Sequence, residues 1–110
     1  MKLESGLVYL PVQEGSGPSP LATDTVKVNF RGTLIDGMEF DSSYKHNQSA
    51  QLVLSKVVKG LAEGLQKMKV GGTARLVCPP TLAYGDKGAG AVIPPSATLV
   101  FEVELLEIKK

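Results

Sequence analysis

The 110-residue chain has one cysteine, one histidine and no tryptophan. With Cys78 alone, no disulfide can form within the chain, and with His46 as the only histidine a four-ligand Cys/His zinc site is excluded. No stretch approaches the roughly 20 apolar residues of a membrane span. Twelve basic and eleven acidic side chains nearly cancel, so the overall field favours no nucleic-acid partner. We expect no nucleic-acid partner and no membrane-spanning segment.

The first ten residues lack the long apolar core of a secretory signal. We therefore expect either a cytoplasmic protein or a mature domain excised from a longer one. Residues 1–5 are interpreted either as a cloning remnant or as the end of a preceding helix.

Alternation of apolar and polar residues predicts strands. Val26, Val28 and Phe30 fall on one face of a strand that begins at Thr25. Asp36-Gly37 predicts the turn of a hairpin. Shorter strands are expected at 6–12, 52–54 and 74–78, and a long last strand at 98–109.

From Val57 the apolar period becomes helical and continues to Met68. Ser55 is the expected N-cap, and Gly71-Gly72 the expected stop. Gly60 and Gly64 lie one turn apart and each costs about 1 kcal/mol relative to alanine in a helix, so we expect that face to approach a sheet closely. The fold class is α+β, in which an antiparallel half-barrel of about five strands wraps around one short helix in a single domain, residues 1–110.

The usual catalytic sets are missing. His46 lies in a polar loop without a nucleophile elbow, and the glycines at 85, 88 and 90 lack the Lys-Ser/Thr of a phosphate loop. Cys78, in an apolar strand, is interpreted as a small buried hydrophobe. We predict no cofactor and no metal.

An apolar and aromatic cluster remains, and its position favours a pocket. Taken singly, Phe30 and Leu61 are typical core residues. However, Val57-Val58 opens a helix directly after a loop, and the glycine-rich loop after Tyr84 ends on the apolar pair Val92-Ile93. Such a loop is typical of a lip over an apolar pocket. Asp41, beside Phe40, fits either an Asx-turn or the polar edge of that pocket.

Six motifs, in this order, resemble one family. They are VNFRGTL at 28–34, DGMEFDSS at 36–43, VVKGLxEGL at 57–65, MxVGG at 68–72, AYG at 83–85 and IPPxATLVFxVEL at 93–105. Together they are similar to the FKBP-type peptidyl-prolyl cis-trans isomerases, and most of all to the bacterial branch of macrophage-infectivity potentiators and periplasmic chaperone-isomerases. In that branch an N-terminal helical arm forms a dimer, and the arm has no counterpart in this sequence. The resemblance leaves a periplasmic location open if this is an excised or mature domain.

The resemblance implies the following roles. The catalytic residues would be Asp41, Tyr84, Phe101 and Phe40. The substrate-binding or inhibitor-binding residues would be Phe30, Val57, Val58, Leu61, Ile93, His46 and Ala89. The Tyr84 hydroxyl and the Val58 N–H would donate to carbonyl groups of the substrate or inhibitor. The expected ligands are X–Pro peptides, unfolded client proteins and rapamycin-type macrolides, bound by a monomeric domain.

Several positions depart from the family's pattern. Leu61 stands where the family usually has tryptophan at the pocket floor, and Phe30 replaces a usual tyrosine. His46 stands where arginine is common, and Ala89 where an aromatic residue or histidine is common. We therefore expect a roomier pocket base. A weakly catalytic or non-catalytic module that binds proline-containing or unfolded chains is the alternative to an isomerase that assists protein folding.

Overall fold

The computed structural model describes residues 2–3, 5–42, 49–88 and 93–109, without the side chain of Asp41. Six strands form one antiparallel sheet in the order β1-β5-β6-β2-β3, and β4 also pairs with β2. The strands are β1 (Val8–Gln13), β2 (Thr25–Leu34), β3 (Glu39–Ser42), β4 (Ala50–Val53), β5 (Thr73–Cys78) and β6 (Leu99–Lys109). The α+β class is confirmed, with six strands instead of about five.

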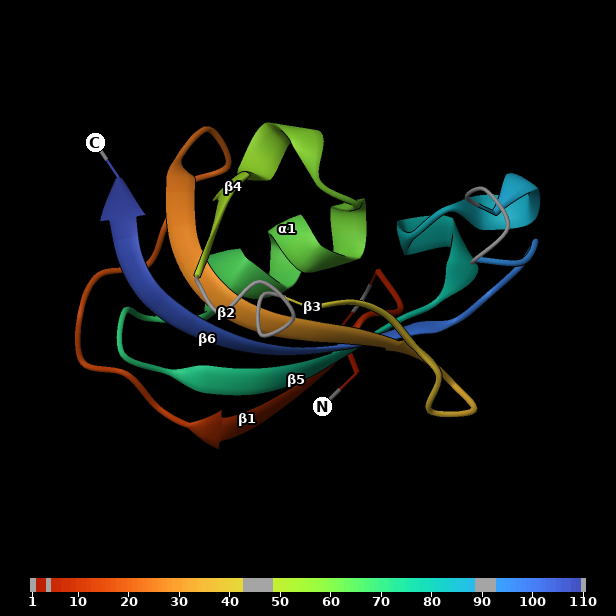
Figure 1. The fold of residues 1–110 in the computed structure, drawn as a ribbon. Helices are drawn as coiled ribbons and strands as arrows, with labels where there is room; N and C mark the ends of the chain where they lie inside the picture. The colour runs from red at the N-terminus through yellow and green to blue at the C-terminus, as the bar shows by residue number, and fades with distance from the viewer. Residues whose placement is uncertain (1, 4, 43–48, 89–92, 110) are drawn as a thin grey trace.

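One edge of β2 is divided between two partners. Its first half pairs with β4, from Thr25 opposite Val53 to Val28 opposite Ala50. Its second half pairs with β3, from Arg31 opposite Ser42 to Thr33 opposite Glu39. The change of partner lets the sheet curve, and Figure 1 shows the curved sheet wrapped around the helix α1 (Lys59–Lys67).

The core fills the space between the concave face of the sheet and α1. Along β2 the side chains of Val26, Val28 and Phe30 are buried, as the alternation predicted. The facing residues of β6 are buried at every second position, from Leu99 to Leu105. This alternation fixes which face of each strand can meet the helix, because a shift of one residue would turn the apolar set to solvent.

The two helix glycines allow the close approach that the sequence predicted. A Cβ at Gly60 would meet the Sγ of Cys78 on β5, and a Cβ at Gly64 would lie 2.6 Å from Cδ2 of Leu76. Real Cβ atoms do not come so near, so α1 reaches β5 only because these side chains are absent. Cys78 is fully buried beneath the helix, as expected.

The predicted ends of the helix were wrong. Ser55 belongs to a 3-10 turn, η2 (Leu54–Lys56), and the N-cap is Val58, which has no side-chain cap. Leu54 is buried in that turn, so the chain passes through extended backbone at Val57 and Val58 before α1 begins. The helix ends at Lys67, and Gly71 (φ +94°) lies in the turn that follows, not at the helix end.

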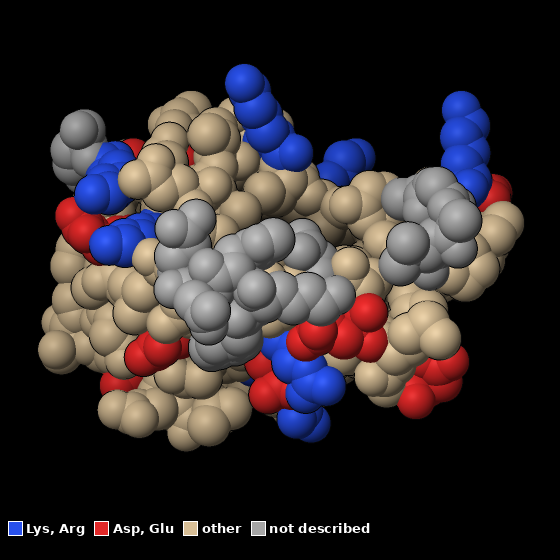
Figure 2. Space-filling view, in the orientation of Figure 1, with Lys and Arg blue, Asp and Glu red and all other residues tan. Residues whose placement is uncertain are grey.

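Two further 3-10 turns, η3 (Pro80–Leu82) and η4 (Gly85–Lys87), lie at one end of the sheet (Figure 1). Basic and acidic side chains are interspersed over the face shown in Figure 2, in keeping with a net charge of +1. Among the described residues, no helix is long and apolar enough to cross a membrane.

Candidate active site

A cavity of about 410 Å³ opens between the sheet and the N-terminal end of α1. It is lined by Phe30, Phe40, Leu52, Lys56, Val57, Val58, Leu61, Ala83, Tyr84 and Phe101. Seven of these ten residues were predicted from the sequence, although they come from five separate segments of the chain. The volume lies within the range of small-molecule sites, about 300–1,000 Å³.

Two phenylalanine rings form one wall of the cavity. The ring centroids of Phe40 on β3 and Phe101 on β6 are 5.7 Å apart and their planes meet at 87°, an edge-to-face pair. Gly32 of β2 allows this arrangement, because a Cβ there would lie 2.5 Å from Cζ of Phe40 and 3.1 Å from Cε1 of Phe101. The role of Gly32 could not be predicted from the sequence, since only the packing of two distant aromatic residues reveals it.

The start of α1 and the two residues before it supply three more lining residues. Val57 and Val58 precede its first turn, and Leu61 lies within that turn with only 5% of its surface exposed. The first N–H groups of a helix have no intrahelical acceptor and face outward from its end. Val57, Val58 and Leu61 therefore add aliphatic side chains to the cavity lining next to the start of α1.

Tyr84 is carried by a loop with internal hydrogen bonds. The N–H of Ser96 donates to the Gly85 carbonyl at 2.8 Å, and the Ser96 hydroxyl donates to Oδ1 of Asp86 at 3.2 Å. Gly88 has φ of +68°, and a Cβ there would lie 2.8 Å from the carbonyl carbon of Pro94. The two arms of the loop are thus held against each other immediately after Tyr84.

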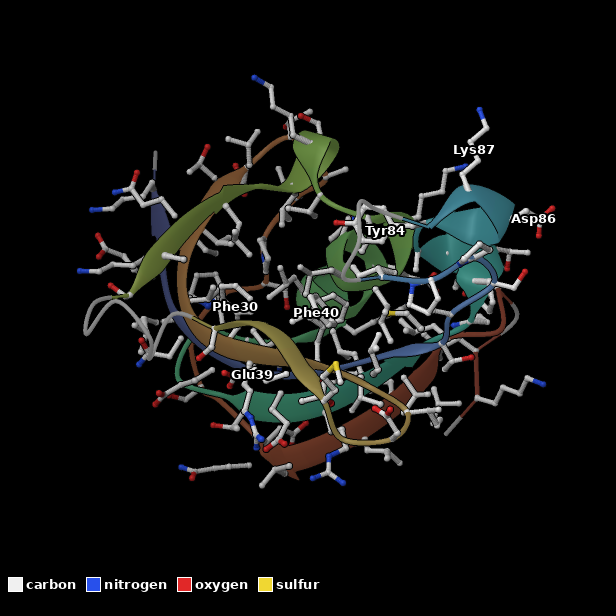
Figure 3. All side chains as sticks on the ribbon, turned by 45° about the vertical axis from the view of Figure 1, so that its right-hand side comes forward. Phe30, Glu39, Phe40, Tyr84, Asp86 and Lys87 are labelled. Carbon is white, nitrogen blue, oxygen red and sulfur yellow. The ribbon has the colours of Figure 1, made fainter. Side chains whose placement is uncertain are left out.

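Tyr84 itself is 42% exposed and lines the cavity. In Figure 3, Phe30, Phe40 and Tyr84 lie toward the middle of the fold, whereas Asp86 and Lys87 point outward. Asp86 and Lys87 are therefore not part of the cavity lining, which includes Tyr84.

Four predicted site residues are not among the described residues that line the cavity. Ile93 is buried in the core, with 6% exposure, and is not among the described residues that line the cavity. Asp41 lies in β3, opposite Gly32, and its side chain is outside the described part of the structure. His46 and Ala89 also lie outside the described residues, as does Val92 of the predicted lip.

The sequence missed three lining residues, namely Leu52, Lys56 and Ala83. Leu52 reads as an ordinary strand residue and Ala83 has no chemical signature. Lys56 directly precedes Val57-Val58, so its position beside two predicted site residues could have indicated that it lines the cavity.

The titratable residues that are described supply no acid–base set. Burial, with Glu63 nearby, raises the pKa of Cys78 to about 12, so this thiol stays protonated at neutral pH. It lies beneath α1, away from the cavity lining. Over the described ranges, no cluster of three His, Cys, Asp or Glu residues could hold a metal ion.

Comparisons with known proteins agree with this geometry. A model of the FKBP-type peptidyl-prolyl cis-trans isomerase family matches residues 17–106. Among curated proteins, the chain is 51% identical over 105 residues to the FKBP-type peptidyl-prolyl cis-trans isomerase FkpA of Escherichia coli K12. The aligned residues cover 96% of this chain and 38% of FkpA. The chain is 47% identical over 108 residues to the peptidyl-prolyl cis-trans isomerase Mip of Coxiella burnetii, covering 98% of this chain and 47% of Mip. The chain therefore spans half or less of the length of these two relatives.

Two solved structures are similar over nearly the whole chain. The crystal structure of FkpA from Escherichia coli superposes with a TM-score of 0.95 at 50% identity, covering 99% of this chain and 51% of that one. A peptidyl-prolyl cis-trans isomerase from Pseudomonas syringae pv. tomato superposes with a TM-score of 0.93 at 38% identity, covering all of this chain and 80% of that one.

Proposed function

Since the chain belongs to the FKBP-type peptidyl-prolyl cis-trans isomerase family, we propose that it catalyses rotation about X–Pro peptide bonds and thereby assists protein folding. The observation that carries this proposal is the aromatic-walled cavity of about 410 Å³ at the entrance of α1. Its lining includes three phenylalanine rings and Tyr84. The Tyr84 hydroxyl and the first N–H groups of α1 would serve as donors, and the reaction requires nothing more reactive.

The energetics of the reaction explain why such a cavity suffices. Rotation about an amide bond has a barrier of roughly 18–20 kcal/mol, because twisting removes resonance. The uncatalysed X–Pro reaction takes tens to hundreds of seconds. Turnover in milliseconds needs a factor of about 10⁴–10⁵, or about 5.5–7 kcal/mol. No covalent bond breaks, so neither a nucleophile nor a metal is required.

An apolar cavity favours the twisted amide over the planar one. The planar amide carries more charge on its oxygen and is better solvated by water. Moving it among Phe30, Phe40 and Phe101 costs the ground state more than the transition state, which has lost part of that charge. Binding energy from the rest of the peptide offsets this cost.

Polar groups would hold the peptide in place. Tyr84 hydroxyl and the Val58 N–H would donate to substrate carbonyls, and Asp41 would supply a field near the twisting amide or orient neighbouring donors. If Asp41 acts in this way, Asp41→Ala lowers turnover of a proline peptide. Full turnover by Asp41→Ala would remove the residue from the mechanism.

The decisive experiment measures turnover and binding on the same protein. We expect acceleration of cis/trans exchange in a neutral Ala-Pro-Phe tetrapeptide, followed by NMR exchange spectroscopy, and of a refolding reaction limited by proline isomerisation. Phe101→Leu should weaken both, because it removes one ring of the edge-to-face pair. Binding of an unfolded protein with no acceleration of either reaction would instead identify a binding module.

Two further expectations belong to the same proposal. A rapamycin-type macrolide should occupy the cavity and raise the melting temperature, since a ligand at 100 times its Kd stabilises the native state by about 2.7 kcal/mol. The isolated chain should elute as a monomer in size-exclusion chromatography. An unchanged melting temperature at saturating macrolide would contradict the ligand assignment.

A further inference from the structure

One charged residue is among those that line the cavity. Among the described lining residues, Lys56 alone carries a charge, and the other nine are aromatic or aliphatic. Lys56 is the last residue of η2 and directly precedes Val57. A cationic group at the rim of an apolar site acts on the ligand that enters it.

The turn that carries Lys56 is anchored. Leu54, two residues earlier, is 2% exposed, and its N–H donates to the carbonyl of Asp24 at 3.1 Å. On the other side, Val57 and Val58 are packed against the core at the start of α1. The backbone of Lys56 is therefore fixed at the rim while its ammonium group stays exposed.

Lys56 has no anionic partner among the described residues. The ion pairs in that part of the chain join Arg31 to Glu39, Arg75 to Glu102, and Lys109 to Glu107. Asp86 accepts a hydrogen bond from Ser96 and points outward in Figure 3. The Lys56 charge is thus available to a bound peptide.

We propose that Lys56 makes this site prefer substrates with an acidic residue close to the proline. The inference rests on the proposed isomerase function and adds the chemical class of the substrate. An extended peptide advances about 3.3–3.6 Å per residue, so a carboxylate within two residues of a bound proline comes within reach of a lysine side chain at the rim.

The size of the preference follows from the exposure of the lysine. Exposed ion pairs are weak because water and salt screen them, and they correspond to an effect of about two- to fivefold on a rate or affinity ratio. Lys56→Glu replaces attraction by repulsion, so it should invert the preference and not merely remove it. The effect should shrink as ionic strength rises, because screening shortens the range of the interaction.

The experiment compares kcat/KM for proline peptides that differ only in one charged position. Glu, Ala or Lys is placed immediately before the proline, two residues before it, or directly after it. The quantity that matters is the Glu/Lys ratio of kcat/KM, measured for wild type, Lys56→Gln and Lys56→Glu at 20 and 200 mM salt. Because each ratio is taken within one variant, a constant field from Asp41 cancels between variants.

Lys59→Glu is the matched control. Lys59 lies three residues away and lines a separate surface hollow on the outer side of α1 with Glu63 and Gln66. The Lys59→Glu substitution changes the net charge by the same amount as Lys56→Glu, and Lys59 does not line the cavity. We expect the Glu/Lys ratio at one or more of the positions to be about two- to fivefold higher in wild type than in Lys56→Gln, to be lower still in Lys56→Glu, and to keep its wild-type value in Lys59→Glu.

Other outcomes overturn the inference. A Glu/Lys ratio that is the same in wild type and Lys56→Gln at all positions, or an equal change in Lys59→Glu and Lys56→Glu, would show that Lys56 does not act on the substrate. Turnover of the Ala peptide without a charge preference would reject this inference and leave the isomerase function intact. If no peptide is turned over, the isomerase proposal fails, and the same Glu/Lys comparison made by calorimetric binding still tests the role of Lys56.

Discussion

Gly32 lies on β2 beneath the edge-to-face pair of Phe40 and Phe101, and Gly32→Ala tests whether that pair forms the working wall of the site. The added Cβ would lie 2.5 and 2.9 Å from two carbons of the Phe40 ring and 3.1 Å from the Phe101 ring. One of the rings must move. Phe40 is only partly buried and borders the cavity, so its ring has free volume to swing into.

The effect on stability is the difference of two contributions. Overpacking of a core costs about 1–3 kcal/mol, while replacing glycine by alanine in a strand gains about 0.5–1 kcal/mol. Since the Phe40 ring can yield into the cavity, we expect a net loss of about 1 kcal/mol, which lowers the melting temperature by about 4–8 °C. The displaced ring occupies the substrate site, so kcat/KM should fall about 10- to 100-fold.

Two control variants separate the wall from the fold. Gly64→Ala places a methyl against Leu76, which is fully buried and does not itself line the cavity, although it lies opposite Phe101 in the sheet. Stability should fall while kcat/KM stays within twofold of wild type. In Gly32→Ala/Phe40→Leu the added methyl no longer meets the Phe40 ring, which is the closer of the two, and urea unfolding should reveal a favourable coupling of about 1 kcal/mol. A Gly32→Ala protein with raised stability and wild-type kcat/KM would refute the reasoning.

Three further predictions concern the thiol, the tyrosine and the loop glycines. For Cys78 the folded pKa is about 12 against an ordinary value of 9.0, so above pH 9 the unfolded chain loses a proton that the folded chain keeps, and stability falls as pH rises. By pH 10 the free energy of unfolding is lower by about 1.4 kcal/mol. Urea unfolding of the wild type at pH 8 and pH 10 should show this difference. An equal difference in Cys78→Ala would assign the pH dependence to other groups. Tyr84→Phe removes one exposed donor, so we expect a two- to tenfold lower kcat/KM with an unchanged melting temperature; unchanged kcat/KM would exclude the hydroxyl. Gly88→Ala should lower the free energy of unfolding by about 2 kcal/mol or more, because φ is +68° and the loop backbone leaves no space for a Cβ. In the control Gly37→Ala, φ is +93° but the Cβ meets nothing within 4 Å, so the loss should be about 1 kcal/mol. Equal losses in thermal unfolding would show that the loop is not tightly packed.

Much of the fold could be predicted because the local pattern and the tertiary contacts agree. The alternation along 25–34 and 99–105 predicted which face of β2 and of β6 is buried. Gly37, which has a positive φ, lies in the turn between β2 and β3, where Asp36-Gly37 predicted a hairpin. The pair Gly60 and Gly64 even predicted a close approach to a sheet, which the contacts with Cys78 and Leu76 confirm.

The helix boundary shows where local reasoning failed. Ser55 has the chemistry of an N-cap, and its position before an apolar run predicted that role. The burial of Leu54 instead draws residues 54–56 into a 3-10 turn, so that Val58 occupies the cap position without a side-chain acceptor. Burial of an apolar side chain outweighed a cap hydrogen bond of about 1 kcal/mol.

The sequence by itself determined the alternating faces, the helix with its two small positions and the set of apolar residues available for a pocket, because each depends on spacing along one segment. Only the tertiary structure decided that Gly32 leaves room for Phe40 against Phe101, that Ile93 is core and that Lys56 is among the lining residues of the cavity. Those facts depend on the distances between side chains from different strands and loops. Such distances are set when the whole sheet closes around α1, and no single segment carries them.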